Sequence, residues 1–495
     1  MPQTVAPDPA HPTLPASPPS EQGVDARGVT AFLDAVEQLP DVQLHGLVVV
    51  RHGHVVARGA WAPYRVDTVG RVYSVSKAFT TTALGLAVAE GLLGLDDRVL
   101  SHLPELDAEV TDPRSRALTL RHLGSMAAGH LTDALDPALA VDPTDLVRGF
   151  LRLPPEREPG THFAYSQPCT YTLATVLQRV TGQRLVDYLR PRLLDPLGVG
   201  PVAWQQDPPG RDVGYSGLHT GADAVASLAQ LYLQRGRWEQ QQLLPGAWVE
   251  EASRVQVGTP DEDDPDWRLG YGLQLWRSRH GYRADGAYGQ LGLVLPQQDA
   301  VVALTSECAS VQPLLEAVWE HLLPALSDGA QGAGDADAEL VRRLAGLRLP
   351  EVDAGPGPAD PARWDGARLP AAPGSSPETP APTSVRVRRA DGRWELSLAH
   401  GEQVLVAPLA GAGWLTDDAP VTDPDGGEVA RVPVATSGGW TADGDLAVDV
   451  AFLQTPHRLR LHARAGADEV DVRWVSAPLW APQLSDLAAP GDLTP

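Results

Sequence analysis

The segment RVYSVSKAFTTTALGLAVAEG, residues 71–91, carries a serine and a lysine three positions apart, at Ser74 and Lys77. Apolar residues recur after Ser74 at helical spacing, and Gly91 is well placed to end the helix. Side chains three positions apart lie on one face of a helix, so this S-x-x-K pattern brings a hydroxyl and an amine together. The segment therefore predicts a serine nucleophile beside a lysine at the start of a buried helix.

Lys77 is the only lysine in the chain, and every other residue in the combined Lys and Arg total of 39 is arginine. Arginine does not give up its proton in a protein, whereas a desolvated lysine can have its pKa lowered and act as a base toward a serine hydroxyl. Lysine at this position therefore indicates a removable proton. The alternative is that a compositional bias against lysine left one residue here by chance.

Strand and helix patterns on both sides of this segment predict a mixed fold. Residues 43–61, QLHGLVVVRHGHVVARGAW, predict a β-hairpin. Across residues 271–306 short apolar strands alternate with turn-forming segments, and a final helical pattern covers residues 311–326. The helical middle of the chain lies between the two strand regions. We therefore expect an α+β fold over residues 26–326, an antiparallel sheet flanked by helices with a helical subdomain.

The rest of the chain differs from this domain in composition. Residues 1–25 are rich in Pro, Ala and Ser and predict a disordered arm. Residues 327–383 are rich in Gly, Pro, Ala and Asp, which predicts a linker with one short helix around residues 340–347. Over residues 384–495 apolar and polar residues alternate between turn signals, so we expect a small antiparallel β domain, either a barrel or a sandwich.

Charge and composition exclude several classes of partner. A formal net charge of -24 repels phosphate backbones and anionic lipid, so we expect neither nucleic acid nor a membrane as a partner. The N-terminal stretch lacks the basic start and apolar run of a secretory signal, which predicts a cytoplasmic protein. Cys169 and Cys308 lack the spacing of a zinc site, and we expect buried free thiols.

Three segments together resemble one family, the serine β-lactamase and DD-peptidase (penicillin-recognising) superfamily, in its branch of β-lactamase-related serine hydrolases. The first is the S-x-x-K helix. The second, EPGTHFAYSQPCTYTLATVLQRVTG (158–182), is similar to the passage that carries the family's tyrosine motif, and the third, GYRADGAYGQLGLVLPQQDAVVALTSE (281–307), is similar to its third-motif strand. The resemblance covers about residues 28–325. It implies the β-lactamase/transpeptidase-like fold for this part of the chain.

The resemblance also implies roles for individual residues. Ser74 becomes the acylated nucleophile and Lys77 its activating partner. Tyr165 matches the tyrosine that relays a proton between nucleophile and leaving group, a role its phenol can fill where nearby positive charge lowers its pKa. The alternative for Tyr165 is a purely structural role in aromatic packing. Where the family often has Asn, two places after this tyrosine, the chain has Gln167.

The third motif departs further from the family pattern. Many members have Lys or His, then Thr or Ser, then Gly, whereas this chain has Ala284, Asp285 and Gly286. A cation that would hold a substrate carboxylate is absent, and Asp285 adds negative charge beside the expected cleft. Gly286 still permits close approach of a substrate, and the amide of Ala287 would join that of Ser74 in an oxyanion hole.

These residues imply hydrolysis of a small ester or amide through an acyl-enzyme, with no metal and no cofactor. Loss of the cationic position makes esterase or amidase activity a better expectation than peptidoglycan carboxypeptidase or potent β-lactamase activity. The competing hypothesis is a non-catalytic binding or regulatory protein that retains the β-lactamase-like fold. The sequence leaves the acyl group, the leaving group and the oligomeric state open.

Overall fold

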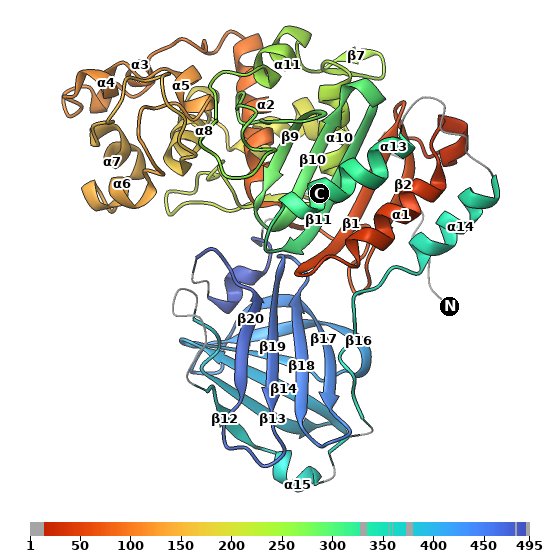
Figure 1. The fold of residues 1–495 in the computed structure, drawn as a ribbon. Helices are drawn as coiled ribbons and strands as arrows, with labels where there is room; N and C mark the ends of the chain where they lie inside the picture. Colours follow the sequence, from red (N-terminus) through yellow and green to blue (C-terminus); the bar gives the residue numbers. More distant parts are fainter. Residues whose placement is uncertain are drawn as a thin grey trace.

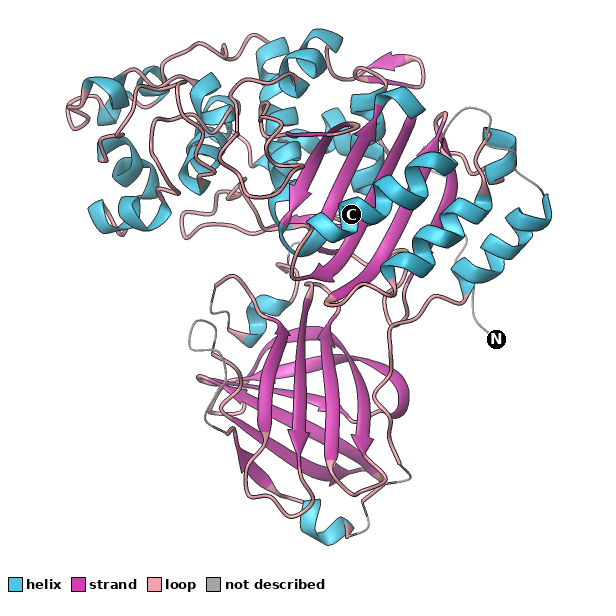
Figure 2. Cartoon of the chain, viewed as in Figure 1, coloured by secondary structure: helices cyan, strands magenta, loops and turns pink. Residues whose placement is uncertain are grey.

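The chain folds into an α+β unit and a separate all-β unit, as the sequence predicts (Figure 1). The computed structural model describes residues 14–326, 334–355, 357–358, 360–372, 380–480 and 483–491. Strands and helices mix in the first unit, whereas strands dominate the second (Figure 2). The predicted fold class is therefore confirmed.

A six-stranded antiparallel sheet with strand order β2-β1-β11-β10-β9-β8 forms the centre of the α+β unit. Its strands are β1 (Val42–Arg51), β2 (His54–Ala60), β8 (Trp276–Ser278), β9 (Gly281–Gly286), β10 (Gln290–Leu295) and β11 (Ala300–Cys308). The predicted hairpin is β1 and β2. Because β1 pairs with β11, the beginning and the end of this unit are joined in one sheet.

Helices cover both faces of this sheet. On β1 successive side chains point to opposite faces, and Leu47 and Val49 pack with α1 (Ala26–Val36) and α12 (Gln312–Ala317). Val48 on the other face belongs to the larger core. That core includes α2 (Ser76–Ala89), α8 (Gln167–Thr181) and α10 (Ala222–Leu233). Helix α2 therefore lies buried between the sheet and the helical subdomain (Figure 1).

Shorter elements complete the unit. The helices are α3 (Val99–His102), α4 (Pro113–Arg116), α5 (Leu120–Gly124), α6 (Leu135–Val141), α7 (Leu146–Arg152), α9 (Leu185–Leu189), α11 (Gly246–Ser253) and α13 (Leu323–Ala325). Small strands are β3 (Gly70–Arg71), β4 (Ala203–Trp204), β5 (Leu218–Thr220), β6 (Arg237–Trp238) and β7 (Gln241–Gln242). Among the described residues, every helix is too short or too polar to cross a membrane.

The second unit is one nine-stranded antiparallel sheet in sequential order. Its strands are β12 (Arg368–Pro370), β13 (Ser384–Ala390), β14 (Arg393–His400), β15 (Gln403–Pro408), β16 (Gly411–Thr422), β17 (Glu428–Trp440), β18 (Leu446–Phe452), β19 (His457–Ala463) and β20 (Asp471–Ser476). The sheet curls until its ends meet, where Ala371 bridges Val470. Inward-facing apolar side chains of these strands fill one core.

The predicted arm, residues 1–25, and the predicted linker, residues 327–383, carry more structure than their composition predicts. Residues 1–13 of the predicted arm lie outside the described residues, but Ala16 bridges Val55 of β2, and a 3-10 turn follows at Pro19–Gln22. The predicted linker helix is α14 (Gly334–Ala345). A second helix, α15 (Pro361–Trp364), and strand β12 also fall within residues 327–383. The predicted domain limits stay predictions.

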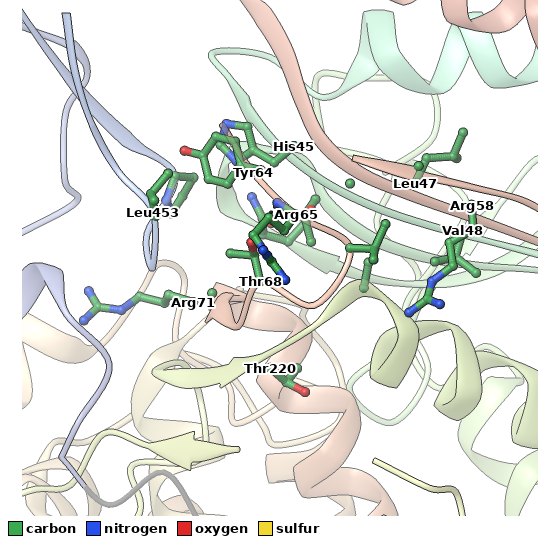
Figure 3. A pocket seen from close by; sticks show the side chains of 18 of the residues that line it. His45, Leu47, Val48, Arg58, Tyr64, Arg65, Thr68, Arg71, Thr220 and Leu453 are labelled. Carbon is green, nitrogen blue, oxygen red and sulfur yellow. Dashed lines mark hydrogen bonds between the residues drawn. The ribbon is translucent and has the colours of Figure 1, made fainter. Parts of the chain in front are cut away.

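A buried ion pair links the two units. Arg458 of β19 donates to both carboxylate oxygens of Glu307 on β11, at 3.1 and 3.2 Å, and to Asp449 of β18 at 2.7 Å. Nearby, Leu453 lines a small cavity of about 40 Å³ together with Tyr64 and His45 of the α+β unit (Figure 3). The all-β unit is therefore attached by specific contacts as well as by the connecting chain.

Candidate active site

Ser74 lies in a 3-10 turn, Tyr73–Val75, directly before α2. Helix α2 itself begins at Ser76, two residues later than the S-x-x-K pattern predicts. Tyr73 has a φ of 48°, in the left-handed region that residues other than glycine seldom adopt. The turn leaves Ser74 half-buried just before the start of the helix.

Lys77 is fully buried and contacts three oxygen atoms. Its Nζ donates to Ser74 Oγ at 2.9 Å, to Gln167 Oε1 at 2.9 Å and to the Tyr215 carbonyl at 2.8 Å. Burial lowers the pKa of Lys77 to about 7, although the negative charge of Asp133 opposes part of the shift. A substantial fraction of this amine is therefore neutral near pH 7.

Gln167 is the first residue of α8, and Asp133 lies beside it. The backbone N–H of Gln167 donates to Asp133 Oδ1 at 3.0 Å, while its side-chain oxygen accepts from Lys77. A glutamine at the position where the family often has asparagine therefore still reaches the lysine. Asp133 is exposed and has no motif around it, so sequence reasoning missed its influence on Lys77.

Tyr165 lies over Lys77 and reaches Ser74. Its ring centroid is 4.7 Å from Lys77 Nζ, and its hydroxyl forms a hydrogen bond with Ser74. The indole of Trp276 stacks on the tyrosine ring, with a distance of 5.7 Å between the ring centroids and an angle of 17° between the ring planes. Burial raises the pKa of Tyr165, and the hydrogen bond with Ser74 offsets only part of this effect. The condition of a lowered pKa is thus not met, and Tyr165 is protonated at neutral pH.

The third-motif strand packs directly against the nucleophile turn. At Gly286, the last residue of β9, a Cβ would lie 2.4 Å from the Val72 carbonyl oxygen and 3.1 Å from Val75 N. Only glycine allows this approach. Ala287 follows in the turn Ala287–Gly289, so its backbone lies next to the turn that carries Ser74.

Asp285 is paired with a buried arginine. Arg283 Nε donates to Asp285 Oδ2 at 2.7 Å, and the guanidinium carbon lies 4.3 Å from the Trp267 ring centroid. Alternate residues of a strand share a face, so Arg283 and Asp285 lie on one side of β9 while Ala284 faces the core behind. Burial raises the pKa of Asp285, and Arg283 opposes that shift. The pair neutralises most of the charge expected from Asp285.

Two further aromatic residues border the site. The Tyr215 ring lies 5.8 Å from Lys77 Nζ. The ring centroid of Trp480, from the all-β unit, lies 6.5 Å from that of Tyr215, and Trp480 is 45% exposed. Neither residue belongs to a recognisable motif, because both reach the site through long-range packing. The all-β unit therefore contributes to the rim of this site.

A cavity of about 240 Å³ lies beside Tyr165. Phe163 and Leu131 give it apolar walls, and Asp261 and Glu262 line another side. Its size suits a small organic group rather than a macromolecule. In the described part of the chain, no three His, Cys, Asp or Glu side chains gather as a set of metal ligands.

Comparison with known proteins assigns the family. The sequence pattern of the Beta-lactamase family matches residues 32–326. The chain belongs to the beta-lactamase family. This membership confirms the resemblance carried by the S-x-x-K, tyrosine and third-motif segments.

Esterases are among the relatives of this family member. The chain is 31% identical over 163 residues to lovastatin esterase of Penicillium rubens. The aligned region covers 28% of this chain and 41% of that protein. The chain is 30% identical over 208 residues to esterase EstB of Burkholderia gladioli, covering 37% and 53%. The chain therefore spans only about half or less of either relative.

A solved structure has the same fold. The putative 6-aminohexanoate-dimer hydrolase from Bacillus anthracis superposes with a TM-score of 0.50 at 18% identity, covering 69% of this chain and 90% of that chain. At this identity the likeness establishes the fold alone.

Proposed function

We propose that this chain is a serine hydrolase that cleaves a small ester or amide through an acyl-enzyme on Ser74. The observation that carries the proposal is the hydrogen bond between Lys77 Nζ and Ser74 Oγ, formed by an amine whose pKa burial lowers to about 7. The neutral amine keeps two N–H groups for the Gln167 and Tyr215 oxygens, and its lone pair accepts the proton of the Ser74 hydroxyl, for which it is the general base. Membership of the beta-lactamase family and similarity to two esterases support the same chemistry.

In the first half of the reaction, neutral Lys77 takes the Ser74 proton as Oγ forms a bond to the substrate carbonyl carbon. The backbone N–H groups of Ser74 and Ala287 would stabilise the oxyanion that results. Tyr165, protonated at neutral pH, gives its proton to the leaving alcohol or amine as the carbonyl–heteroatom bond breaks, and recovers a proton from Lys77. The products are an ester on Ser74 and a neutral leaving group.

In the second half, a water molecule attacks the acyl carbon and passes its proton to Lys77. The Oγ–carbon bond breaks, Ser74 recovers that proton, and the carboxylic acid departs. Lys77 thus returns to the neutral form with which the cycle began. Every proton taken up by the amine is delivered within the cycle, so no external acid is required.

The substrates proposed are neutral or cationic. At the position where many relatives have a cation for a carboxylate, this chain has Ala284, whose side chain faces the core. Arg283 is buried and already paired with Asp285, so it offers little charge to an anionic substrate. The acidic residues Asp261 and Glu262 at the neighbouring cavity disfavour anions further.

Hydrolysis of a short p-nitrophenyl ester tests this proposal. Wild type should release p-nitrophenol catalytically, and Ser74→Ala should reduce the rate to background. Ser101→Ala, at an exposed serine on α3, is the matched control and should retain wild-type turnover. A wild type that binds the ester without turnover would instead support the non-catalytic alternative suggested by Gln167 and the altered third motif.

A further inference from the structure

Two tyrosines next to the proposed oxyanion donors meet the same histidine of the all-β unit. Tyr73 directly precedes Ser74, and Tyr288 directly follows Ala287. The Tyr73 hydroxyl lies 2.6 Å from His457 Nε2, and the Tyr288 ring lies 5.0 Å from the His457 ring. The two tyrosine rings are themselves 5.1 Å apart, edge to face. One residue of β19 therefore contacts both flanks of the proposed oxyanion hole.

Both tyrosines have backbone conformations that require support. Tyr73 has a φ of 48° and Tyr288 a φ of 64°, both in the left-handed region. Such a conformation is unfavourable in a residue other than glycine and persists where surrounding contacts determine it. The Tyr73 dihedral angles adjoin the peptide group that carries the N–H of Ser74. The φ of Tyr288 adjoins the peptide group after Ala287, one peptide beyond the proposed donor N–H. The contacts that fix the two rings therefore also fix the two turns that carry the proposed donors.

His457 is built to accept a hydrogen bond from Tyr73. Its Nδ1 lies 3.1 Å from the Ser476 carbonyl oxygen, which can only accept, so Nδ1 carries the proton and Nε2 is the acceptor. The ring is fully buried, and burial lowers the pKa of His457 to about 3. The histidine is thus neutral throughout the range in which Lys77 titrates.

The surrounding contacts make this support rigid. The Tyr288 hydroxyl donates to the Ala477 carbonyl, just after β20. The residue after His457 is Arg458, which forms the buried bidentate pair with Glu307. The end of β18, the beginning of β19 and the end of β20 lie next to the α+β unit, beneath its sheet (Figure 1). His457 and the Ala477 carbonyl of the all-β unit thus contact the two turns that contain Tyr73 and Tyr288.

We propose that His457 is a positioning residue for the reaction, through which the all-β unit holds the peptide groups beside Ser74 and Ala287 in the geometry needed for acylation. The inference rests on the proposed serine hydrolase activity. It assigns the all-β unit a role in the chemical step, in addition to a role in stability or in the rim of the cleft. His457 itself touches no substrate.

Rates of covalent modification of Ser74 in full-length variants test the inference. His457→Phe keeps an aromatic ring but removes the acceptor, and it should slow phosphonylation of Ser74 by a fluorophosphonate by about tenfold or more. His457→Gln offers a side-chain oxygen to Tyr73 and should restore much of the rate. With an ester substrate, kcat should fall while KM changes little, because the substrate cavity beside Tyr165 is untouched.

A double-mutant cycle separates positioning from general destabilisation. Tyr73→Phe should reproduce the loss seen in His457→Phe, and the double variant should lose no more than either alone, since both remove one interaction. Leu461→Ala, in the core of the all-β unit, is the matched control. It should lower the melting temperature at least as much as His457→Phe while leaving the phosphonylation rate unchanged.

The outcomes distinguish this inference from the proposed function. A wild type that does not react with the fluorophosphonate would overturn both the proposed hydrolase function and the positioning role of His457. A reactive wild type with an equally reactive, folded His457→Phe would overturn only the positioning role. Equal losses in Leu461→Ala and His457→Phe, or strictly additive losses in the double variant, would assign the effect to stability and likewise overturn it.

Discussion

Lys77 Nζ lies 2.9 Å from Ser74 Oγ, and the lysine is fully buried. A lysine in this position costs folding free energy when it is charged, and burial therefore lowers its pKa toward neutrality. The same burial that destabilises the ammonium produces a base near the working pH. This relationship connects the sequence pattern to the proposed chemistry.

Replacing the amine by a permanently charged group tests its role as a base. Lys77→Arg keeps a cation at this position but cannot accept a proton at neutral pH. We expect ester hydrolysis to fall at least about a hundredfold. Steady-state kinetics on a folded variant, checked by circular dichroism, measure the effect. Activity close to wild type would remove Lys77 from proton transfer.

The pH dependence of kcat/KM should report the same amine. Because the neutral form is active, the rate should rise with pH through an apparent pKa of about 7. Asp133 favours the protonated form, so Asp133→Asn should move this rise to lower pH. The asparagine oxygen can still accept from the Gln167 backbone, which keeps the local structure. An unchanged or upward shift would contradict the assignment.

The leaving group should reveal the role of Tyr165. A p-nitrophenolate departs without a proton, whereas an amine needs one. Tyr165→Phe preserves stacking on Trp276, and we expect it to slow amide hydrolysis about a hundredfold and p-nitrophenyl ester hydrolysis much less. Parallel assays with the ester and the amide of one acyl group provide the comparison. Equal losses on both substrates would argue that Tyr165 acts before the leaving group departs.

The buried ion pair between Arg458 and Glu307 should matter most for stability when only one of its two charges is removed. Arg458→Met leaves Glu307 buried without its partner and should cost about 3 kcal/mol of unfolding free energy. Adding Glu307→Gln removes the unpaired charge and should recover part of that loss. Urea denaturation of wild type, the single variant and the double variant gives the three values. A double variant less stable than the single one would contradict this account.

The local parts of the site could be predicted from the sequence, and the long-range parts could not. Ser74 and Lys77 are three positions apart, so helical geometry alone brings them together. Arg283 could be considered as a compensating cation, but neighbouring strand residues face opposite ways, and that argument applies to Ala284 only. Arg283 and Asp285 are two positions apart and therefore share a face. Interactions made by residues distant in sequence require the folded chain.

Tyr215 and His457 illustrate the second group. The Tyr215 carbonyl reaches Lys77 across 138 sequence positions, and His457 reaches Tyr73 across 384. Neither residue has a motif around it. Backbone carbonyls carry no sequence signature, and a buried histidine on a strand is more often structural than functional. Their roles follow only from the packing of the two units.

Covalent labelling of Ser74 tests the central claim most directly. Intact-mass measurement after exposure to a fluorophosphonate should show one adduct on wild type, none on Ser74→Ala, and one on the control Ser101→Ala. This result would place an activated nucleophile at the S-x-x-K serine. An unmodified wild type, or an adduct that persists in Ser74→Ala, would contradict the account.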